Sequence, residues 1–457
     1  MCHMWCWARA FRLRSCHANI LRVRAHSTSS ASKTFTVQAD SRPTLRMVPR
    51  HGKEKGGDAR ISRSVPWIFR NEAENFEELQ KSGHTALLVN VENSEGREIG
   101  AAVCNLHKGV NIIARIVSDN VAVPIDQAFF VQRVIRALAH RQQFVQDVMH
   151  CRLVNSEGDL LPGILCDRYD DTICVQFTSA AMECLFETHV LDALEEVLEP
   201  RAIIQRYDLH RDRQLEHAPI RAPTLARGQY TAPTVVAEGA FSFEADLLSE
   251  GWCSGRFFED RPLRLLLRQR LATCDSDSAP VPQVLSLFTE SLGVFCASTG
   301  VPTICGIASG DCFESQKAHL EQLAIRNDCA EQVQVLQVDG SGAQGFTHIS
   351  PVRFDIVTLE PPPLAPTYGP LEDAMRQYTA LIAAAAATLK PGGLLLVVCR
   401  SRAMSIVRLL RCVNLGIWSC GRQAQVIYRT GAAPGDFPIH MALPNTGQLQ
   451  AIGLRVH

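Results

Sequence analysis

A carboxylate followed by a run of prolines is the first feature of this sequence that could take part in chemistry. Residues 354–363 read FDIVTLEPPP, so a short and mostly apolar strand ends at Glu360. A strand buried on both faces is typical of a parallel sheet, and such sheets bind ligands at the carboxyl ends of their strands. Prolines restrict the conformations of the loop that follows. The stretch therefore predicts that Glu360 and Pro361 lie beside a ligand.

The thiol of Cys399 is a second candidate, at the end of a later apolar run that reads GGLLLVVCRS from residue 392. A cysteine thiolate is a strong nucleophile that can form covalent intermediates. Successive residues of a strand point to opposite faces, so Cys399 and Arg400 face different sides of the sheet if the strand includes both. Two interpretations stay open: Cys399 is a catalytic nucleophile, or it is a small residue of the core.

The segments around these residues alternate between apolar runs of strand length and helical patterns. The expected strands are 284–288, 303–307, 333–338, 354–359 and 392–398, and helices are expected near 315–326 and 372–389. Alternation of this kind predicts an α/β fold with a Rossmann-like parallel sheet covered by helices on both faces. We expect this domain to span residues 248–457.

The first half of the chain has a different pattern. Short apolar runs in residues 44–120, with a hairpin turn at Asn93–Gly96, predict a small β-barrel. A helix should begin after Asp126, with Val131, Ile135 and Leu138 on its buried face and three arginines (133, 136 and 141) outside. Further strands and a helix at 180–198 predict a central α/β unit over 121–247. Residues 218–234 are rich in Pro and Ala and predict a loop.

Composition bounds the class of protein. The 457 residues are 46% hydrophobic and 20% charged, as in globular proteins. No run reaches the about 18 apolar residues that a membrane span needs, so we expect no membrane partner. The 17 cysteines include no CxxC pair. Their scatter predicts reduced thiols, and neither a zinc site nor another metal site.

The first 39 residues hold six of the basic residues and no acid. Arginine, serine and apolar residues without carboxylates are typical of an organelle transit peptide. This predicts an organellar protein, in the mitochondrion or, as the alternative, a plastid. A basic tail or a misjudged start codon is the other interpretation. Without this segment 40 basic residues stand against 47 acidic ones. A nucleic acid would then be held by local basic patches and not by overall charge.

Several motifs in order carry a family resemblance. They are SVPWIF (64–69), LVNSEGDLLPGILCDRYDD (153–171), SGRFFEDRPLR (254–264), the strands that end near Phe288, Asp339 and Glu360, and the closing FPIHMALPNTGQLQAIGLRV (437–456). From about Met47 onward the chain resembles the bacterial-type large-subunit ribosomal RNA cytosine-C5 methyltransferases. The resemblance implies an N-terminal PUA domain and a C-terminal class I methyltransferase domain that uses S-adenosyl-L-methionine.

The resemblance also implies roles for individual residues. Cofactor contacts are expected from eight residues besides Glu360, namely Phe257, Glu259, Arg261, Phe288, Gly293, Asp311, Asp339 and Pro361. A strand-end cap for Asp339 and a solvated charge run for 259–261 are the plain alternatives. Two positions depart from the family: Leu292 replaces a glycine of the first turn, and Ala308 stands where an acid would bind the ribose.

The implied reaction adds a cysteine thiolate to C6 of cytosine so that C5 can accept a methyl group. Arg400 occupies the family's thiol position, and Cys399 precedes it. For RNA contacts we expect Trp67, Arg60, Arg63 and Arg115. Trp67 could equally be barrel core, and the basic stretch 50–63 could serve solubility alone.

The sequence therefore predicts an RNA methyltransferase that acts on ribosomal RNA, with cytosine C5 as the acceptor. The alternative is a catalytically inactive RNA-binding or ribosome-assembly factor that keeps the fold, because the cofactor glycine, the ribose acid and the thiol position are all altered. A third reading is transfer to another acceptor atom. The oligomeric state is left open, with a homodimer as one option.

Overall fold

The hairpin expected at Asn93–Gly96 is the centre of the first sheet. In the computed structural model of the chain the Asn93 side chain accepts hydrogen bonds from the backbone of Glu95 and Arg97, at 3.0 and 2.7 Å, and so closes the turn. The structure describes residues 41–48, 65–208, 210–231, 233–249, 255–272, 280–288, 291–308, 313–338, 353–362, 364, 371–401, 403–444, 447 and 449–457. Among these residues the strands form sheets of five, five, two and seven strands.

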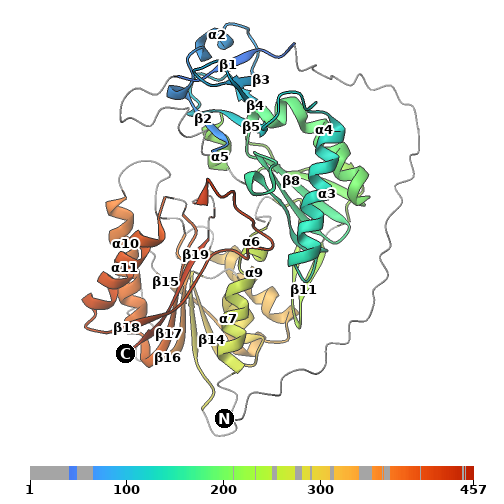
Figure 1. The fold of residues 1–457 in the computed structure, drawn as a ribbon. Helices are drawn as coiled ribbons and strands as arrows, with labels where there is room; N and C mark the ends of the chain where they lie inside the picture. The colour runs from blue at the N-terminus through green and yellow to red at the C-terminus, as the bar shows by residue number, and fades with distance from the viewer. Residues whose placement is uncertain are drawn as a thin grey trace, which may run out of the picture. The chain divides into compact units, whose positions relative to one another are not determined.

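The first sheet has the order β1-β3-β4-β5-β2, and all its pairs are antiparallel except β1 with β3 (Figure 1). Its elements are β1 (Thr44–Arg46), β2 (Trp67–Phe69), η2 (Arg70–Glu72), α2 (Phe76–Gln80), β3 (Ala86–Glu92), β4 (Glu98–Asn105) and β5 (Ile112–Ser118). Apolar side chains such as Leu45, Val89 and Ile113 fill one core cluster on this sheet. The alternating pattern of its strands produces this buried face.

The second sheet has the order β10-β9-β8-β7-β6. Its elements are α3 (Gln127–Phe144), β6 (His150–Asn155), η3 (Ser156–Asp159), β7 (Ile164–Tyr169), β8 (Thr172–Phe177), α4 (Ala180–Leu198), β9 (Ala202–Arg206), α5 (His210–Leu215) and β10 (Thr224–Gly228). The helices α3 and α4 pack against each other, and apolar residues of both share a core cluster with this sheet. Asp126 caps α3 as expected, accepting from the backbone of Phe129 at 3.0 Å.

The buried face predicted for α3 was only partly right, because Val131 and Leu138 do pack against the core cluster. Phe130, Val134 and Ala137 face the core, whereas Ile135 is exposed. Arg141, expected outside, is fully buried and donates to the Asp159 carboxylate at 2.5 and 2.9 Å. Apolar periodicity located the helix but could not place its face, because an arginine can be buried where a carboxylate partners it.

The loop expected at 218–234 is also only partly a loop. Residues 224–228 form β10, which pairs antiparallel with β9 at the edge of the second sheet. A two-stranded sheet follows, made of β11 (Thr234–Glu238) and β12 (Phe241–Ala245). Short strands at a sheet edge bury few side chains and therefore contain few apolar residues. The Pro- and Ala-rich composition of this segment for that reason did not predict them.

The last sheet has the order β15-β14-β13-β16-β17-β19-β18, parallel except for the two pairings of β19. Its elements are α6 (Arg256–Glu259), α7 (Arg261–Ala272), β13 (Val284–Leu287), α8 (Leu292–Ala297), β14 (Thr303–Ala308), α9 (Phe313–Arg326), η4 (Ala330–Gln332), β15 (Val333–Val338), β16 (Phe354–Leu359), α10 (Glu372–Ala387), β17 (Leu389–Cys399), α11 (Ile406–Ser419), β18 (Ala424–Thr430) and β19 (Gln450–Val456). The Rossmann-like α/β fold expected from the sequence is confirmed.

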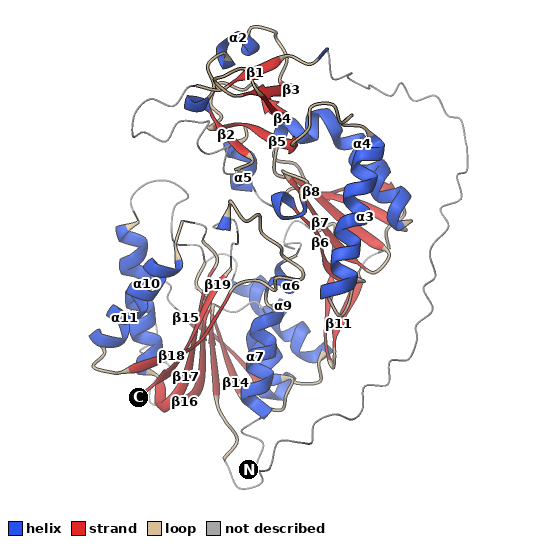
Figure 2. Ribbon diagram, in the orientation of Figure 1, coloured by secondary structure: helices blue, strands red, loops and turns tan. Residues whose placement is uncertain are grey.

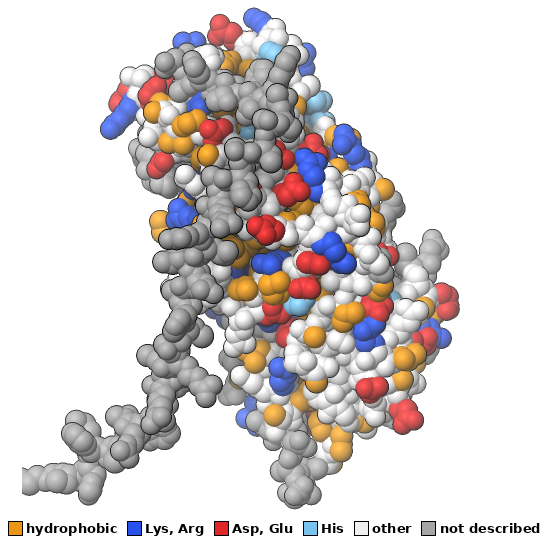
Figure 3. All heavy atoms as spheres, turned by 90° about the vertical axis from the view of Figure 1, so that its right-hand side faces the viewer, with side chains coloured by type: hydrophobic (Ala, Val, Ile, Leu, Met, Phe, Trp, Pro, Cys, Tyr) orange, Lys and Arg blue, Asp and Glu red, His pale blue; other side chains and the backbone are white. Residues whose placement is uncertain are grey.

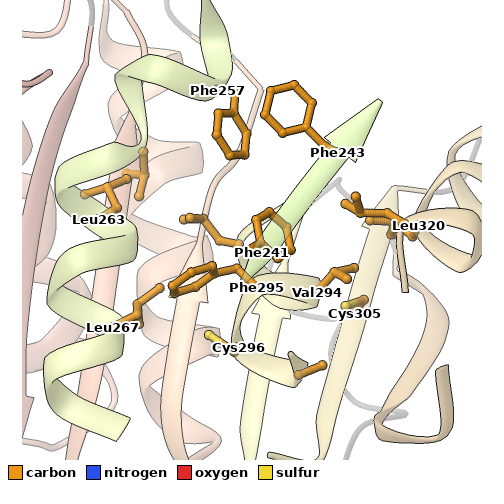
Figure 4. Packing of buried hydrophobic residues seen from close by; sticks show 14 of the residues in the cluster. Phe241, Phe243, Phe257, Leu263, Leu267, Val294, Phe295, Cys296, Cys305 and Leu320 are labelled. Carbon is orange, nitrogen blue, oxygen red and sulfur yellow. The ribbon is translucent and has the colours of Figure 1, made fainter. Parts of the chain in front are cut away.

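Helices cover both faces of this sheet (Figure 2). On one face, α10 and α11 share a hydrophobic cluster with Leu395, Val397 and Cys399 of β17. On the other, helices α7 to α9 and strand β12 share a second cluster with Leu394, Leu396 and Val398. Figure 4 shows this second cluster, in which the rings of Phe241 and Phe295 meet edge to face with centroids 5.4 Å apart. The residues of β17 thus alternate strictly between the two cores.

Contacts divide the chain into two units, and residues 37–457 are one of them. The domain boundaries expected at residues 120 and 247 therefore stay predictions. None of the described helices combines the length and hydropathy needed to cross a membrane.

Candidate functional site

The strand order of the seven-stranded sheet creates a crevice at the ends of two adjacent strands. From β13 the chain moves outward through β14 and β15, then returns to the other side of β13 as β16 and β17. Such a reversal leaves the carboxyl ends of β13 and β16 without a connection crossing between them, and α/β proteins bind ligands there. Phe288 follows β13 at this edge, and Glu360 follows β16. The expected position of Glu360 beside the crevice is consistent with this topology.

The turn after β13 has an unusual backbone. Phe288 has φ of +58°, a left-handed conformation that aromatic residues seldom adopt. Its amide donates to Gly306 O of β14 at 2.7 Å, which fixes the start of the turn. Conformations of this kind cluster at functional sites, where the surrounding structure compensates their cost.

Gly293 is the residue of this turn that has no room for a side chain. A Cβ there would lie 2.5 Å from Cys305 Sγ and 2.9 Å from Ser286 Cβ, so α8 packs directly onto β13 and β14. Leu292, which replaces a glycine of the family's first turn, is fully buried and belongs to the core cluster shared with α7 and α9. Core packing therefore accommodates its side chain.

The residues expected to contact the adenosine part of the cofactor lie at or after the ends of β14 and β15. Ala308 ends β14 and packs against the cluster on the α10 side of the sheet. Asp311 and Asp339 lie outside the described residues. Their proposed cofactor contacts stay predictions, as does that of Pro361, which follows Glu360 directly.

A buried group of three charges occupies the ends of β16 and β17. The Arg400 guanidinium forms an ion pair with Asp260, and its Nη2 lies 3.6 Å from Glu360 Oε2. The three side chains are at most 10% exposed. Burial alone lowers the pKa of Arg400, but the Asp260 and Glu360 carboxylates outweigh it and raise that pKa above its usual value. Arg400 is therefore a permanent cation at the edge of the crevice.

The alternation of β17 explains why Arg400 and not Cys399 reaches this group. Leu396 and Val398 face the α7 side, so Arg400 continues that row toward Asp260. Cys399 faces the other core, where its thiol donates to the Tyr378 hydroxyl at 3.4 Å. Burial raises the pKa of this thiol, which disfavours the thiolate that a nucleophile requires. The catalytic role of Cys399 stays a prediction, and its geometry is that of a core residue.

The charged run at 259–261 is largely internal. Asp260 is buried beside Arg400, and Arg261 donates to Asp436 Oδ2 at 2.5 Å and to His150 O at 2.8 Å. Phe257 is also buried, and its ring lies beside that of Phe243 (Figure 4). The two ring centroids are 3.7 Å apart. These contacts hold α6 and α7 in place. Cofactor contacts by Phe257, Glu259 and Arg261 stay predictions.

Asp436 pairs with Arg261 next to the candidate site, and the sequence did not identify it as a candidate residue. Burial raises the pKa of its carboxyl to about 6, although Arg261 and Arg141 oppose the shift. It follows a glycine in a loop with no periodic pattern, and its partner Arg261 is 175 positions away. Only the folded chain brings the two together, so no local signal could have identified the pair.

A cleft of about 890 Å³ adjoins this edge of the sheet. Glu259, Ala403 and Gln450 line it, which places it next to Asp260 and Arg400. Its other walls come from several parts of the chain: residues 67–69 and 109–115 at the first sheet, residues 152–178 of the second sheet, residues 212–216 at α5, and residues 429–449 from the end of β18 to the start of β19. Pockets of 300–1,000 Å³ hold small organic ligands, so about 890 Å³ has room for a nucleotide.

Trp67 and Arg115, expected to contact RNA, both line this cleft. Trp67 Nε1 donates to Glu157 Oε1 at 2.7 Å, and Arg115 Nη2 donates to Glu216 Oε1 at 2.7 Å. Arg115 is buried, while the nearby Glu216 and Glu157 raise its pKa. Both side chains are thus engaged inside the protein. Arg60 and Arg63 lie outside the described residues, and their RNA contacts stay predictions.

Charge and metal-binding groups add little to this picture. On the face that Figure 3 shows, basic and acidic side chains are interspersed. No group of three or more His, Cys, Asp or Glu side chains suited to a metal ion occurs in the part of the chain that the structure describes.

Comparisons with known proteins agree on the fold. No family model matches the chain. The chain is 27% identical over 424 residues to ribosomal RNA large subunit methyltransferase I of Shewanella amazonensis, covering 90% of this chain and 100% of that protein. It is 25% identical over 407 residues to the protein of the same name from Pseudoalteromonas translucida, covering 88% and 98%.

Solved structures are similar over the same length. SMU.776, a protein crystallised with SAH, superimposes with a TM-score of 0.70 at 17% identity, covering 90% of this chain and all of that one. A SAM-dependent methyltransferase from Streptococcus mutans superimposes with a TM-score of 0.67 at 15% identity and the same coverage. These likenesses establish the fold.

The relatives also correct one prediction. The organellar location, in a mitochondrion or plastid, was wrong, because the relatives found are bacterial proteins. The first 39 residues, which suggested it, lie outside the described residues. Nothing in the comparisons favours the inactive-factor alternative. The chain thus has the Rossmann-like fold of S-adenosylmethionine-dependent methyltransferases and is similar, over about nine-tenths of its length, to bacterial enzymes named for methylating large-subunit ribosomal RNA.

Proposed function

We propose that this protein transfers the methyl group of S-adenosylmethionine to large-subunit ribosomal RNA. The observation that carries the proposal is the end-to-end similarity to bacterial ribosomal RNA large subunit methyltransferase I, which covers 98–100% of those relatives. The crevice at the ends of β13 and β16 supports it, because a strand-order reversal is where α/β proteins hold nucleotide-like ligands.

The cofactor would lie across that crevice. Its proposed neighbours are Phe288 and Gly293 at the first turn, Asp311 and Asp339 after the next two strands, and Glu360 and Pro361 after β16. The Gly293 packing supports this position, since it allows the turn to lie close to the sheet edge. The group supplies an electrophilic methyl on sulfur, and the protein supplies its orientation and the exclusion of water.

The RNA would occupy the adjoining cleft. We propose that the first sheet is PUA-like and forms one wall, where Trp67, Ile112 and Arg115 line the cavity. The central unit (121–247) and the catalytic unit (248–457) would form the other walls. A nucleotide drawn into this space would come next to Arg400 and Glu360.

Cytosine C5 is the first acceptor to test, with Cys399 as the thiol. This chemistry requires Cys399 to leave its contact with Tyr378 and turn toward the crevice, against the alternation of β17. Arg400 at the crevice face favours a second acceptor class. A ring nitrogen, exocyclic amine or hydroxyl has a lone pair of its own and needs no thiol addition.

One experiment tests the function and the acceptor together. The gene is disrupted in its own host, and nuclease fragments of large-subunit ribosomal RNA are compared by mass spectrometry. The proposal predicts the loss of one methyl mark and its return when the unchanged gene is restored. Tandem fragmentation of the marked nucleoside then reports whether the methyl group sat on C5 or on another atom. Identical maps from both strains would overturn the proposal.

A further inference from the structure

The loop between β18 and β19 presents the most exposed large apolar side chain of the described residues. Met441 is 91% exposed, and Ile439 is 45% exposed. Single exposed apolar side chains are ordinary on protein surfaces. Met441 differs in two respects, the fixed loop that carries it and its place at the cleft.

Hydrogen bonds hold the first arm of this loop, residues 436–438, to two neighbouring elements. Arg141 Nη2 donates to Asp436 O at 2.8 Å, and Asn155 Nδ2 donates to Pro438 O at 2.9 Å. Gly158 packs so closely that a Cβ there would lie 1.9 Å from Pro438 O. The base of the loop is therefore anchored to α3 and to the β6–η3 region.

The tip is a tight turn. The Leu443 amide donates to His440 O at 2.8 Å, and the Ala442 amide donates to His440 Nδ1 at 3.2 Å. Met441 is the first of the two central residues of this turn. An anchored loop that ends in a closed turn fixes the backbone at Met441, so contact would cost the rotamer freedom of the side chain but little backbone freedom.

The turn lies at the cleft. Ile439 and Ala442, on either side of Met441 in sequence, both line the 890 Å³ space, as does Leu443. Arg429, at the end of β18, lines it too and is exposed, so a cation stands near the same opening. Met441 does not itself line the space, but it lies in the chain between residues that do, so it stands close to the place that an entering base would pass.

Enzymes that modify a base inside a helix must first extrude it, which costs the stacking and pairing of that base. Apolar side chains, methionine among them, enter base stacks in proteins that unstack nucleic acids. We propose that Met441 inserts into the RNA stack at the place of the extruded target nucleotide. This inference rests on the proposed function and adds a positioning residue to it.

The test compares two RNAs that carry the nucleotide mapped by the mass-spectrometric experiment. In one oligonucleotide it is paired within a hairpin stem, and in the other the same sequence is single-stranded. In the single strand the base needs no extrusion. Met441→Ala should lower kcat/KM on the hairpin about tenfold, a fraction of the stacking cost, and change it less than about twofold on the single strand. Met441→Leu, which keeps an apolar side chain, should retain activity on both.

Ile325→Ala is the matched control. Ile325 is 66% exposed near the end of α9, the end opposite the ligand edge of the sheet, and should affect neither RNA. A 2-aminopurine placed beside the target in the hairpin should brighten when the unchanged protein binds, and brighten less with Met441→Ala. Equal losses on both RNAs, or no loss on the hairpin, would overturn the inference. Absence of transfer by the unchanged protein to either RNA would overturn the proposed function itself.

Discussion

Arg400 forms a buried ion pair with Glu360 across the ends of the neighbouring strands β17 and β16, with 3.6 Å between Nη2 and Oε2. Asp260 pairs with the same guanidinium from the start of α7. One cation therefore joins the helical layer to the ligand edge of the sheet. Removing one member of a buried group leaves charges that nothing else compensates.

Arg400→Met should lower the free energy of unfolding by about 3–5 kcal/mol, because it leaves two buried carboxylates without their cation. Urea unfolding followed by tryptophan fluorescence measures this. The exposed Arg411 on the next helix is the matched control, and Arg411→Met should change stability by less than about 0.5 kcal/mol. Equal stabilities for the two variants would show that the ion pairs contribute nothing.

Gly293→Ala should destabilise the protein by about 1–3 kcal/mol, the usual cost of overpacking a core. The added Cβ would meet Cys305 Sγ at 2.5 Å, so α8 must move away from the sheet. We expect cofactor affinity to fall with it. Gly447→Ala, where the nearest atom is 3.9 Å away, is the control that should be neutral. Thermal unfolding and calorimetry of both variants check this, and a neutral Gly293→Ala would contradict the close packing.

Asp436 predicts a pH-dependent contribution to stability. Its pKa rises from 3.8 to about 6 on folding, so the folded state binds the proton more tightly than the unfolded chain. The stability that the protonated carboxyl contributes is complete below the unfolded pKa of 3.8 and is lost as the pH rises through 6. Relative to the unchanged protein, Asp436→Asn should therefore gain about 3 kcal/mol between about pH 3 and about pH 7, from about 1.4 kcal/mol per pKa unit.

Stability curves of the two proteins, measured by urea unfolding at intervals of half a pH unit, test this relation. The difference should change between about pH 3 and about pH 7 and be constant at higher pH. Parallel curves over the whole range would contradict a raised pKa for Asp436.

Cys399 should be protected from alkylation in the folded protein. It is fully buried against Tyr378, and burial raises its pKa, so little thiolate forms near neutral pH. Iodoacetamide should label the exposed Cys184 within minutes and leave Cys399 unmodified until the protein unfolds. Peptide mass mapping gives both rates. Fast labelling of Cys399 in the presence of cofactor and RNA would instead favour a catalytic role, in which its thiolate adds to C6 of cytosine.

The sequence predicted the parallel strands of the seven-stranded sheet closely, because a run such as 354–359 is apolar on both faces and ends at prolines. Glu360 follows one of these strands, as expected, and its contact with a ligand stays a prediction. The prediction misplaced Ile135 and Arg141 of α3, because the buried Arg141 makes the core-facing side of the helix look polar in the sequence. Side-chain pairing between distant segments, as in Arg261 with Asp436 or Arg400 with Asp260, has no local pattern and depends on the folded chain.

Binding of the methyl donor tests the central claim most directly. Isothermal titration of the full chain with S-adenosylmethionine, and separately with its demethylated product, should give saturable binding to one site per chain. Gly293→Ala should weaken that binding, and Ile325→Ala should leave it unchanged. No measurable heat with either ligand at millimolar concentration, from protein that unfolds cooperatively, would contradict the account.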